Sequence, residues 1–117
     1  MRIIVVGATG TIGKAVVAAL QELRHEVLAA SRKSSLHVDI SDPASIKAMY
    51  RSAGRFDAVV SAAGDARFKP FPQLTDDDYQ YCLANKLMGQ ANLVRYGMDS
   101  IADNGSFTLT TGVLAKN

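Results

Sequence analysis

Three glycines close to the N-terminus are the residues whose spacing points most clearly to chemistry. Gly7, Gly10 and Gly13 lie three residues apart and directly follow the apolar run Ile3 to Val6. Glycine lets the backbone turn sharply, approach a phosphate without an intervening Cβ, and bring the next helix close to the strand. A helix that begins near Thr11 directs free N–H groups and its positive dipole end toward the same place. The sequence therefore predicts a dinucleotide site built from a strand, a turn and a helix.

The polar residues after the second expected strand indicate which dinucleotide would bind. An acidic residue about twenty positions beyond the glycines would bind the ribose 2′-hydroxyl and reject a 2′-phosphate. Ser31, Arg32 and Lys33 stand there instead, and residues 29–38 include no acidic side chain. A guanidinium can stack on adenine and pair with a phosphate, while a hydroxyl and an ammonium add further donors. The pattern favours NADP(H) over NAD(H); the alternative is an ordinary solvated basic turn.

The rest of the chain is expected to supply the elements that position this site. Apolar runs predict strands at residues 3–6, 26–30, 56–61 and 106–111, and a short third strand or extended segment at 36–40. Helical periodicity predicts helices at 11–23, 43–52 and 75–97. The link before the 36–40 segment is too short for a crossover helix, although parallel neighbours normally need about a dozen connecting residues. The expected fold is α/β: one domain, residues 1–117, with a three-layer αβα Rossmann-like parallel sheet of about five strands.

Local signals set the ends of the two later helices. Asp42 and Pro43 form a strong helix start, and Gly54 ends that helix. Thr75 precedes three aspartates, which suit the first turn of the long third helix. The apolar residues of this helix are expected to face the core: Tyr79, Leu83, Leu87, Ala91, Leu93 and Val94. The Asp-Asn-Gly sequence at 103–105 predicts a turn before the last strand.

Composition narrows the classes of partner. A net charge of +2 over 117 residues is too small to indicate nucleic acid or a membrane surface. The single Cys82 excludes an internal disulfide and a cysteine metal cluster, so it is expected to be a small buried hydrophobe. Neither His25 nor His37 has ligand spacing, and no metal is expected. The first apolar run is too short for a signal peptide or a bilayer span, which makes a cytoplasmic protein the default expectation.

These motifs together resemble the N-terminal part of the short-chain dehydrogenase/reductase family. The glycine turn is similar to that family's GxxGxxG loop, and Asp39-Ile40 is similar to the acidic-aliphatic pair beside adenine. Residues 61–64 resemble the NNAG segment with both asparagines replaced, and Asn85 resembles the helix asparagine that holds a water in the proton relay. The resemblance implies that the coenzyme contacts Gly7, Thr9, Gly10, Thr11, Ile12, Gly13, Ser31, Arg32, Lys33, Asp39, Ile40, Ala62, Ala63 and Gly64.

The implied activity is hydride transfer between NADP(H) and a carbonyl or alcohol substrate. Asn85 and Thr111 are the candidate catalytic residues, but an ungapped count from Gly105 puts Gly112 at the position of the family's serine. The YxxxK pair is absent, because no tyrosine here has a lysine four residues later. The expectation is a truncated or atypical member that binds NADPH without turnover. The alternative is a noncatalytic redox-sensing module, and a flavin or mononucleotide binder is a third option.

Three further points stay open at this stage. Asp39 either accepts from the adenine amine or caps the following turn. Asn85 either serves a relay or makes only local hydrogen bonds, and Thr111 is either catalytic or an ordinary strand residue. A homo-oligomer is also open, since family members commonly pair through the long helix that begins at Thr75.

Overall fold

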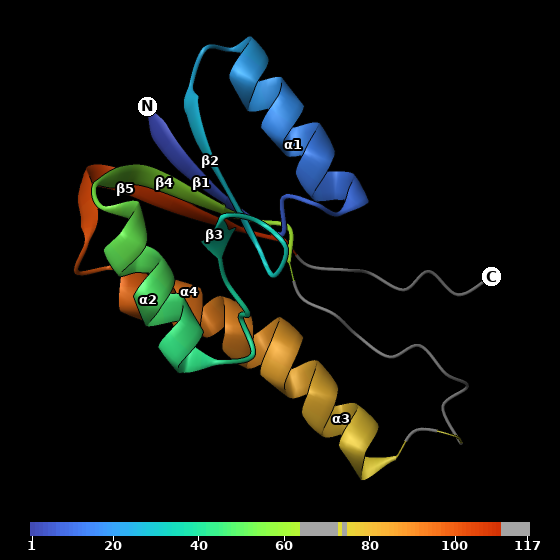
Figure 1. The fold of residues 1–117 in the computed structure, drawn as a ribbon. Helices are drawn as coiled ribbons and strands as arrows, with labels where there is room; N and C mark the ends of the chain where they lie inside the picture. Colours follow the sequence, from blue (N-terminus) through green and yellow to red (C-terminus); the bar gives the residue numbers. More distant parts are fainter. Residues whose placement is uncertain (64–72, 74, 111–117) are drawn as a thin grey trace.

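A five-stranded parallel sheet forms the centre of the molecule (Figure 1). The computed structural model describes residues 1–63, 73 and 75–110, except for the side chains of residues 82, 85 and 86. In the described part the strands are β1 (Arg2–Val6), β2 (Glu26–Ser31), β3 (Leu36–His37), β4 (Phe56–Ser61) and β5 (Ile101–Leu109). Their order is β3-β2-β1-β4-β5, and every neighbouring pair is parallel. The expected Rossmann-like α/β architecture is confirmed.

Helices cover both faces of the sheet. The helix α1 (Thr11–Glu22) lies on one face, whereas α2 (Pro43–Ala53) and α4 (Gly89–Gly97) lie side by side on the other (Figure 1). The chain reaches α4 through α3 (Asp76–Cys82) and a π-helical segment, η2 (Leu83–Met88). Figure 1 shows α3 extending beyond the sheet. The three layers predicted from the alternation of elements are therefore present.

Alternate residues of β1 supply the two halves of the core. Ile4 and Val6 face α2 and α4, and Ile3 and Val5 face α1. A strand that pairs on both edges and is covered by helices on both faces has a continuous run of apolar residues. The sequence of β1 has this pattern. The layer beneath α2 and α4 also contains Ala30, Ile46, Met49, Tyr50, Phe56, Val59 and Leu93, all buried.

The predicted helix ends are confirmed by their capping contacts. The Asp42 carboxylate accepts from the backbone N–H of Ala44 at 3.0 Å, and Gly54 ends α2 with φ of 71°. Thr75 and Asp78 form a reciprocal capping box at the start of α3. These signals are local, so they act in the same way whatever the tertiary context.

The third strand is much shorter than expected, with two residues instead of five. Ala30 pairs with Leu36 across a four-residue link that holds no helix. The hydroxyls of Ser31 and Ser34 lie 2.7 Å apart, and the N–H of Val38 donates to the carbonyl of Ser31 at 3.1 Å. A tight polar turn can thus join two parallel strands because the second strand pairs over only two residues.

The prediction that the apolar residues of the long helix face the core is wrong for most of them. Tyr79, Leu83 and Leu87 are 45%, 46% and 60% exposed, and Ala91 is exposed as well. Two causes combine: α3 lies beyond the sheet, and the i→i+5 bonding of η2 rotates the helix faces relative to a regular α-helix. The residues of α4 that are buried instead are Gly89, Gln90, Asn92, Leu93 and Gly97.

The last strand begins five residues earlier than predicted. Phe56 pairs with Ile101 and Ala58 with Ser106, so a bulge of β5 lies opposite Asp57. Asn104 has φ of 62° inside this bulge. The Asp-Asn-Gly turn chemistry is therefore used within the strand, where it makes a bulge and not a separate turn.

Candidate functional site

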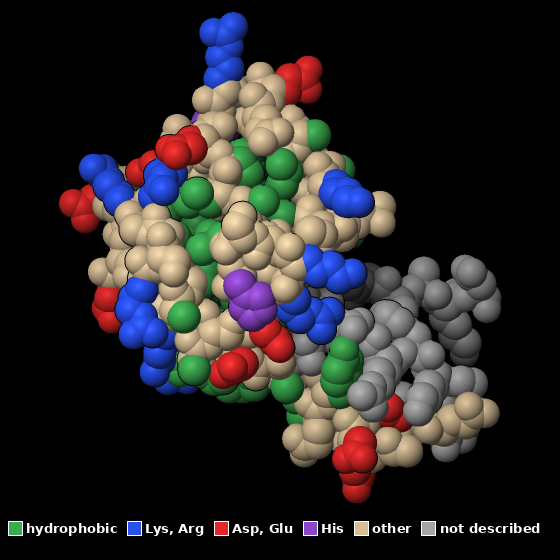
Figure 2. All heavy atoms as spheres, viewed as in Figure 1, with side chains coloured by type: hydrophobic (Ala, Val, Ile, Leu, Met, Phe, Trp, Pro, Cys, Tyr) green, Lys and Arg blue, Asp and Glu red, His purple; other side chains and the backbone are tan. Residues whose placement is uncertain are grey.

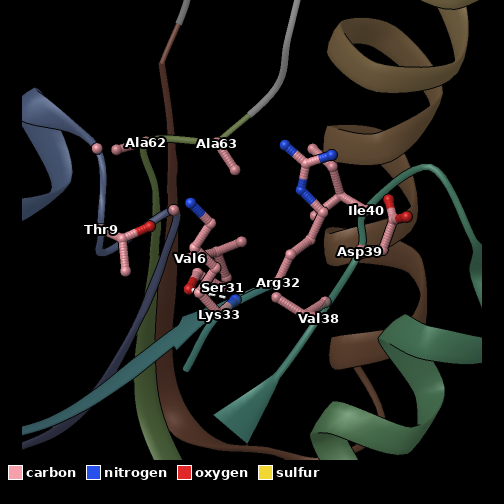
Figure 3. A pocket seen from close by; sticks show the side chains of 12 residues that line it. Val6, Thr9, Ser31, Arg32, Lys33, Val38, Asp39, Ile40, Ala62 and Ala63 are labelled. Carbon is pink, nitrogen blue, oxygen red and sulfur yellow. Dashed lines mark hydrogen bonds between the residues drawn. The ribbon is translucent and has the colours of Figure 1, made fainter. Parts of the chain in front are cut away.

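A hollow lies at the carboxyl ends of β1, β2 and β4, beside the start of α1 (Figure 3). The strand order reverses between β1 and β4, and open α/β sheets bind ligands at such a switch point. Its volume is about 400 Å³. The residues that line it are Val6, Gly7, Thr9, Gly10, Ser31, Arg32, Lys33, Val38, Asp39, Ile40, Ala62 and Ala63.

The three glycines of the turn have different physical reasons to be glycine. Gly7 has φ of 81°, and a Cβ there would lie 2.7 Å from the backbone nitrogen of Ala63. A Cβ on Gly13 would overlap the carbonyl oxygen of Gly7, so this glycine lets α1 pack against the turn. A Cβ on Gly10 would meet only the Gly7 oxygen, at an ordinary 3.6 Å. Gly10 alone therefore borders space that the described protein leaves open, which is where a bound anion would need room.

The start of α1 presents unpaired donors to this space. Gly10 is its N-cap, with no side-chain cap and no acidic residue in the first turn. The first N–H groups of a helix lack intrahelical acceptors and carry the positive end of the dipole. Thr11 and Ile12 do not line the hollow, and the Ile12 side chain is 63% exposed. Any contact of these two residues with a ligand would come through their backbone.

Basic side chains form the opposite wall. Figure 3 shows Arg32 extending on the side of Ile40 and Lys33 on the side of Thr9. Neither cation makes an ion pair with any residue that the structure describes. Figure 2 shows basic side chains gathered next to a histidine in the middle of this face. An anionic ligand would thus meet two cations that hold no salt bridge with a described residue, although the Asp39 carboxylate also lines the hollow.

Ser31 is buried at the base of this wall, where its hydroxyl oxygen accepts from the backbone N–H of Lys33 at 3.1 Å. The serine therefore fixes the turn that presents the two cations.

Asp39 performs the turn-capping role that the sequence left open. Its Oδ1 accepts from the backbone N–H of Ser41 at 3.0 Å and from the Ser41 hydroxyl at 2.6 Å. The hydroxyl bond is the main reason that the pKa of Asp39 lies below its ordinary value. Asp39 also lines the hollow, so the capping role does not remove it from reach of a ligand.

Two apolar residues of the wall, Val6 and Val38, were missed by the sequence reasoning. Both are buried: Val6 is the last residue of β1, and Val38 directly follows β3. Their only sequence signal is that they precede the polar site residues. Ser61, at the end of β4, is fully buried, and its hydroxyl has no hydrogen-bond partner in the described part of the chain.

Several predicted site residues lie outside the described residues: Gly64, the Asn85 side chain, Thr111 and Gly112. The Cys82 side chain lies outside them too. Among the residues that the structure does describe, no group of three potential metal ligands occurs. The described helices include none that is both long and apolar enough to cross a membrane.

Sheet order, glycine turn and basic wall together define a dinucleotide-binding α/β protein of the Rossmann class. The model of the NAD dependent epimerase/dehydratase family matches residues 3–113. The chain belongs to this family. The solved structures that it resembles include a small-chain dehydrogenase that is 27% identical.

Among solved structures, the protein lin1944 from Listeria innocua is 48% identical, with a TM-score of 0.91 over 96% of this chain and 56% of that one. A small-chain dehydrogenase in complex with NADPH is 27% identical, with a TM-score of 0.86 over 96% of this chain and 51% of that one. The chain therefore spans little more than half the length of these neighbours. No curated protein matches it.

Proposed function

We propose that the chain is the coenzyme-binding part of an NADP(H)-dependent short-chain oxidoreductase that acts on a carbonyl or alcohol. The observation that carries the proposal is that the open space at Gly10 and the side chains of Arg32 and Lys33 line one hollow, and that neither cation has an ion-pair partner among the described residues. The diphosphate would lie against the start of α1, and the 2′-phosphate would lie between the two cations.

The fit of a dinucleotide is supported by the chemistry of the walls. Val38 and Ile40 offer apolar surface to an adenine ring, and Arg32 offers a planar cation to stack on it. The nicotinamide, when bound, supplies or accepts the hydride. This chain's own residues bind, orient and neutralise the coenzyme.

Proton transfer has no assigned donor in the sequence. None of the four tyrosines is followed by a lysine four residues later. We therefore propose that residues 1–117 lack the C-terminal part of the family fold, bind NADPH and do not turn over a carbonyl substrate. A second candidate function is redox sensing without catalysis, which is favoured by Gly112 at the serine position and by the two alanines after Ser61.

A titration with NADPH, NADH and FMN tests the coenzyme assignment. We expect NADPH to bind about tenfold or more tightly than NADH, because charge-assisted bonds to a phosphate contribute about 1.5–3 kcal/mol. Arg32→Asp should reverse this order, because a carboxylate repels the 2′-phosphate and accepts from a 2′-hydroxyl.

Arg24→Asp is the matched control. It makes the same charge change just beyond the C-terminal end of α1, about 18 Å along the helix axis from the glycine turn, and should leave the order unchanged. Equal binding of NADPH and NADH would remove the 2′-phosphate from the proposal. Tighter binding of FMN than of either would replace the proposal by a flavin site.

A further inference from the structure

The side-chain amide of Gln90 holds the end of β5. Its Nε2 donates to the carbonyl oxygen of Thr110 at 2.9 Å, and the N–H of Thr110 donates to its Oε1 at 3.2 Å. Gln90 is 7% exposed, and Thr110 directly follows the last residue of β5. A primary amide has the same donor and acceptor as a peptide group, so Gln90 pairs with Thr110 as a neighbouring strand would. We call this pair of bonds the Gln90 clamp.

The residue before the clamp lies against the wall of the coenzyme pocket. A Cβ on Gly89 would lie 2.8 Å from Cδ1 and 3.0 Å from the carbonyl oxygen of Ile40. Ile40 is 5% exposed and lines the hollow. Any side chain at this position would require Ile40 to shift, so the glycine lets the start of α4 approach the Ile40 backbone this closely. Two adjacent residues of one helix thus contact the pocket wall and the end of β5.

We propose that Gln90 is a positioning residue, which holds Thr110 in place at the carboxyl end of β5, the edge of the parallel sheet at which the coenzyme pocket lies. The chain continues from Thr110 to Thr111 and Gly112, the two positions that resemble the family's serine. The functional part of this inference rests on the proposed function, because it takes the hollow to be the coenzyme site. The clamp itself rests only on the hydrogen bonds of Gln90 and the contact of Gly89.

Gln90→Glu tests the clamp through a pH-dependent rescue. At pH 8 the introduced carboxylate still accepts from the Thr110 N–H, but it cannot donate and faces a carbonyl oxygen. We expect amide exchange at Thr110, measured by NMR as a protection factor, to become about tenfold faster, because one of the two part-buried bonds is lost and the carboxylate repels the Thr110 carbonyl oxygen. Burial raises the pKa of such a carboxyl, so it regains a proton near pH 5 and protection should return.

Two companion variants make the result decisive. Gln80→Glu makes the same change on an exposed residue of α3 and should alter Thr110 exchange at neither pH. Gln90→Met keeps the length of the side chain without its polar atoms, so protection should be lost at both pH values. Unchanged exchange in Gln90→Met, or no recovery of protection in Gln90→Glu at pH 5, would overturn the clamp.

Gly89→Ala tests the link to the pocket. The added methyl must displace Ile40, so we expect NADPH to bind about fivefold or more weakly and Thr110 to exchange faster. Gln90→Glu at pH 8 should leave NADPH affinity unchanged, because Gln90 does not line the pocket. Weaker binding with full Thr110 protection in Gly89→Ala would refute the link. If the unmodified chain binds no dinucleotide, the proposed function fails, while Thr110 exchange in Gln90→Glu still decides the clamp.

Discussion

Replacing Gly10 by alanine should separate coenzyme binding from folding. The backbone at Gly10 has φ of −78° and ψ of 173°, which alanine adopts without strain. Among the described residues, its Cβ would meet only the Gly7 carbonyl oxygen, at 3.6 Å. Alanine is a poorer N-cap than glycine, which costs about 0.5–1 kcal/mol. The smaller entropy of the unfolded chain offsets this by about 0.4–1 kcal/mol. The net change in the free energy of unfolding should therefore lie within about 1 kcal/mol of zero.

Binding should respond much more strongly than stability. In Gly10→Ala, the added methyl would occupy the space through which a diphosphate approaches the first N–H groups of α1. An anion at a helix N-terminus gains up to about 2 kcal/mol in a partly buried geometry, which corresponds to roughly thirtyfold in affinity. The change in affinity is measured by titrating NADPH fluorescence, and stability by urea unfolding. If Gly10→Ala binds NADPH as tightly as the unmodified chain, the diphosphate does not lie against this turn.

Gly13→Ala is the matched comparison. Its Cβ would overlap the Gly7 carbonyl oxygen, which is backbone and cannot move aside as a side chain can. Overpacking of this kind costs about 1–3 kcal/mol, so unfolding should shift to lower urea concentration before any loss of binding is considered. The two alanine substitutions thus differ in which measurement changes first. Equal unfolding midpoints for Gly13→Ala and the unmodified chain would show that α1 does not need this close approach.

Two further predictions concern stability. Tyr50→Phe removes the hydrogen bond from the buried hydroxyl to the carbonyl oxygen of Leu93 (2.6 Å) and should lower the free energy of unfolding by about 1 kcal/mol in urea, whereas Tyr79→Phe at an exposed position should not. The Ser41 hydroxyl lowers the pKa of Asp39 in the folded state. The contribution of Asp39 to the free energy of unfolding is therefore complete above its ordinary pKa of 3.8 and is lost as the pH falls below that value. Asp39→Asn should therefore destabilise the protein at pH 7 and lose this effect toward pH 2; an equal effect at both pH values would contradict the assigned cause.

Most of the fold, and the position of two basic residues beside the candidate site, could be predicted because their signals are local. The glycine spacing, the Asp42-Pro43 helix start and the Thr75 capping box act through residues within one turn of each other. Strands of β-branched residues alternating with helices then leave few arrangements besides a parallel sheet. The position of Arg32 and Lys33 directly after β2 could be predicted for the same reason, since the local sequence determines where this strand ends.

The errors came from elements whose environment is decided by distant residues. Apolar spacing marked Leu83 and Leu87 as core residues, but it carries no information on whether the sheet extends far enough to cover them. The Asp-Asn-Gly sequence at 103–105 predicts a turn. The pairing of β5 with the strand residues on either side of Asp57 is needed to show that this segment is a bulge. Periodicity describes one element at a time and cannot reveal a π-helical change of face within it.

The sequence by itself determined where the backbone turns, which helix end presents donors, and the sign of the charge beside the pocket, because each depends on neighbours in the chain. Only the tertiary structure decided that Gly89 lies on Ile40 and that the Gln90 amide pairs with Thr110. A glutamine in a helix has no sequence signal for its partner. Its role arises when folding brings the end of a strand twenty residues away within hydrogen-bonding distance and buries the glutamine side chain.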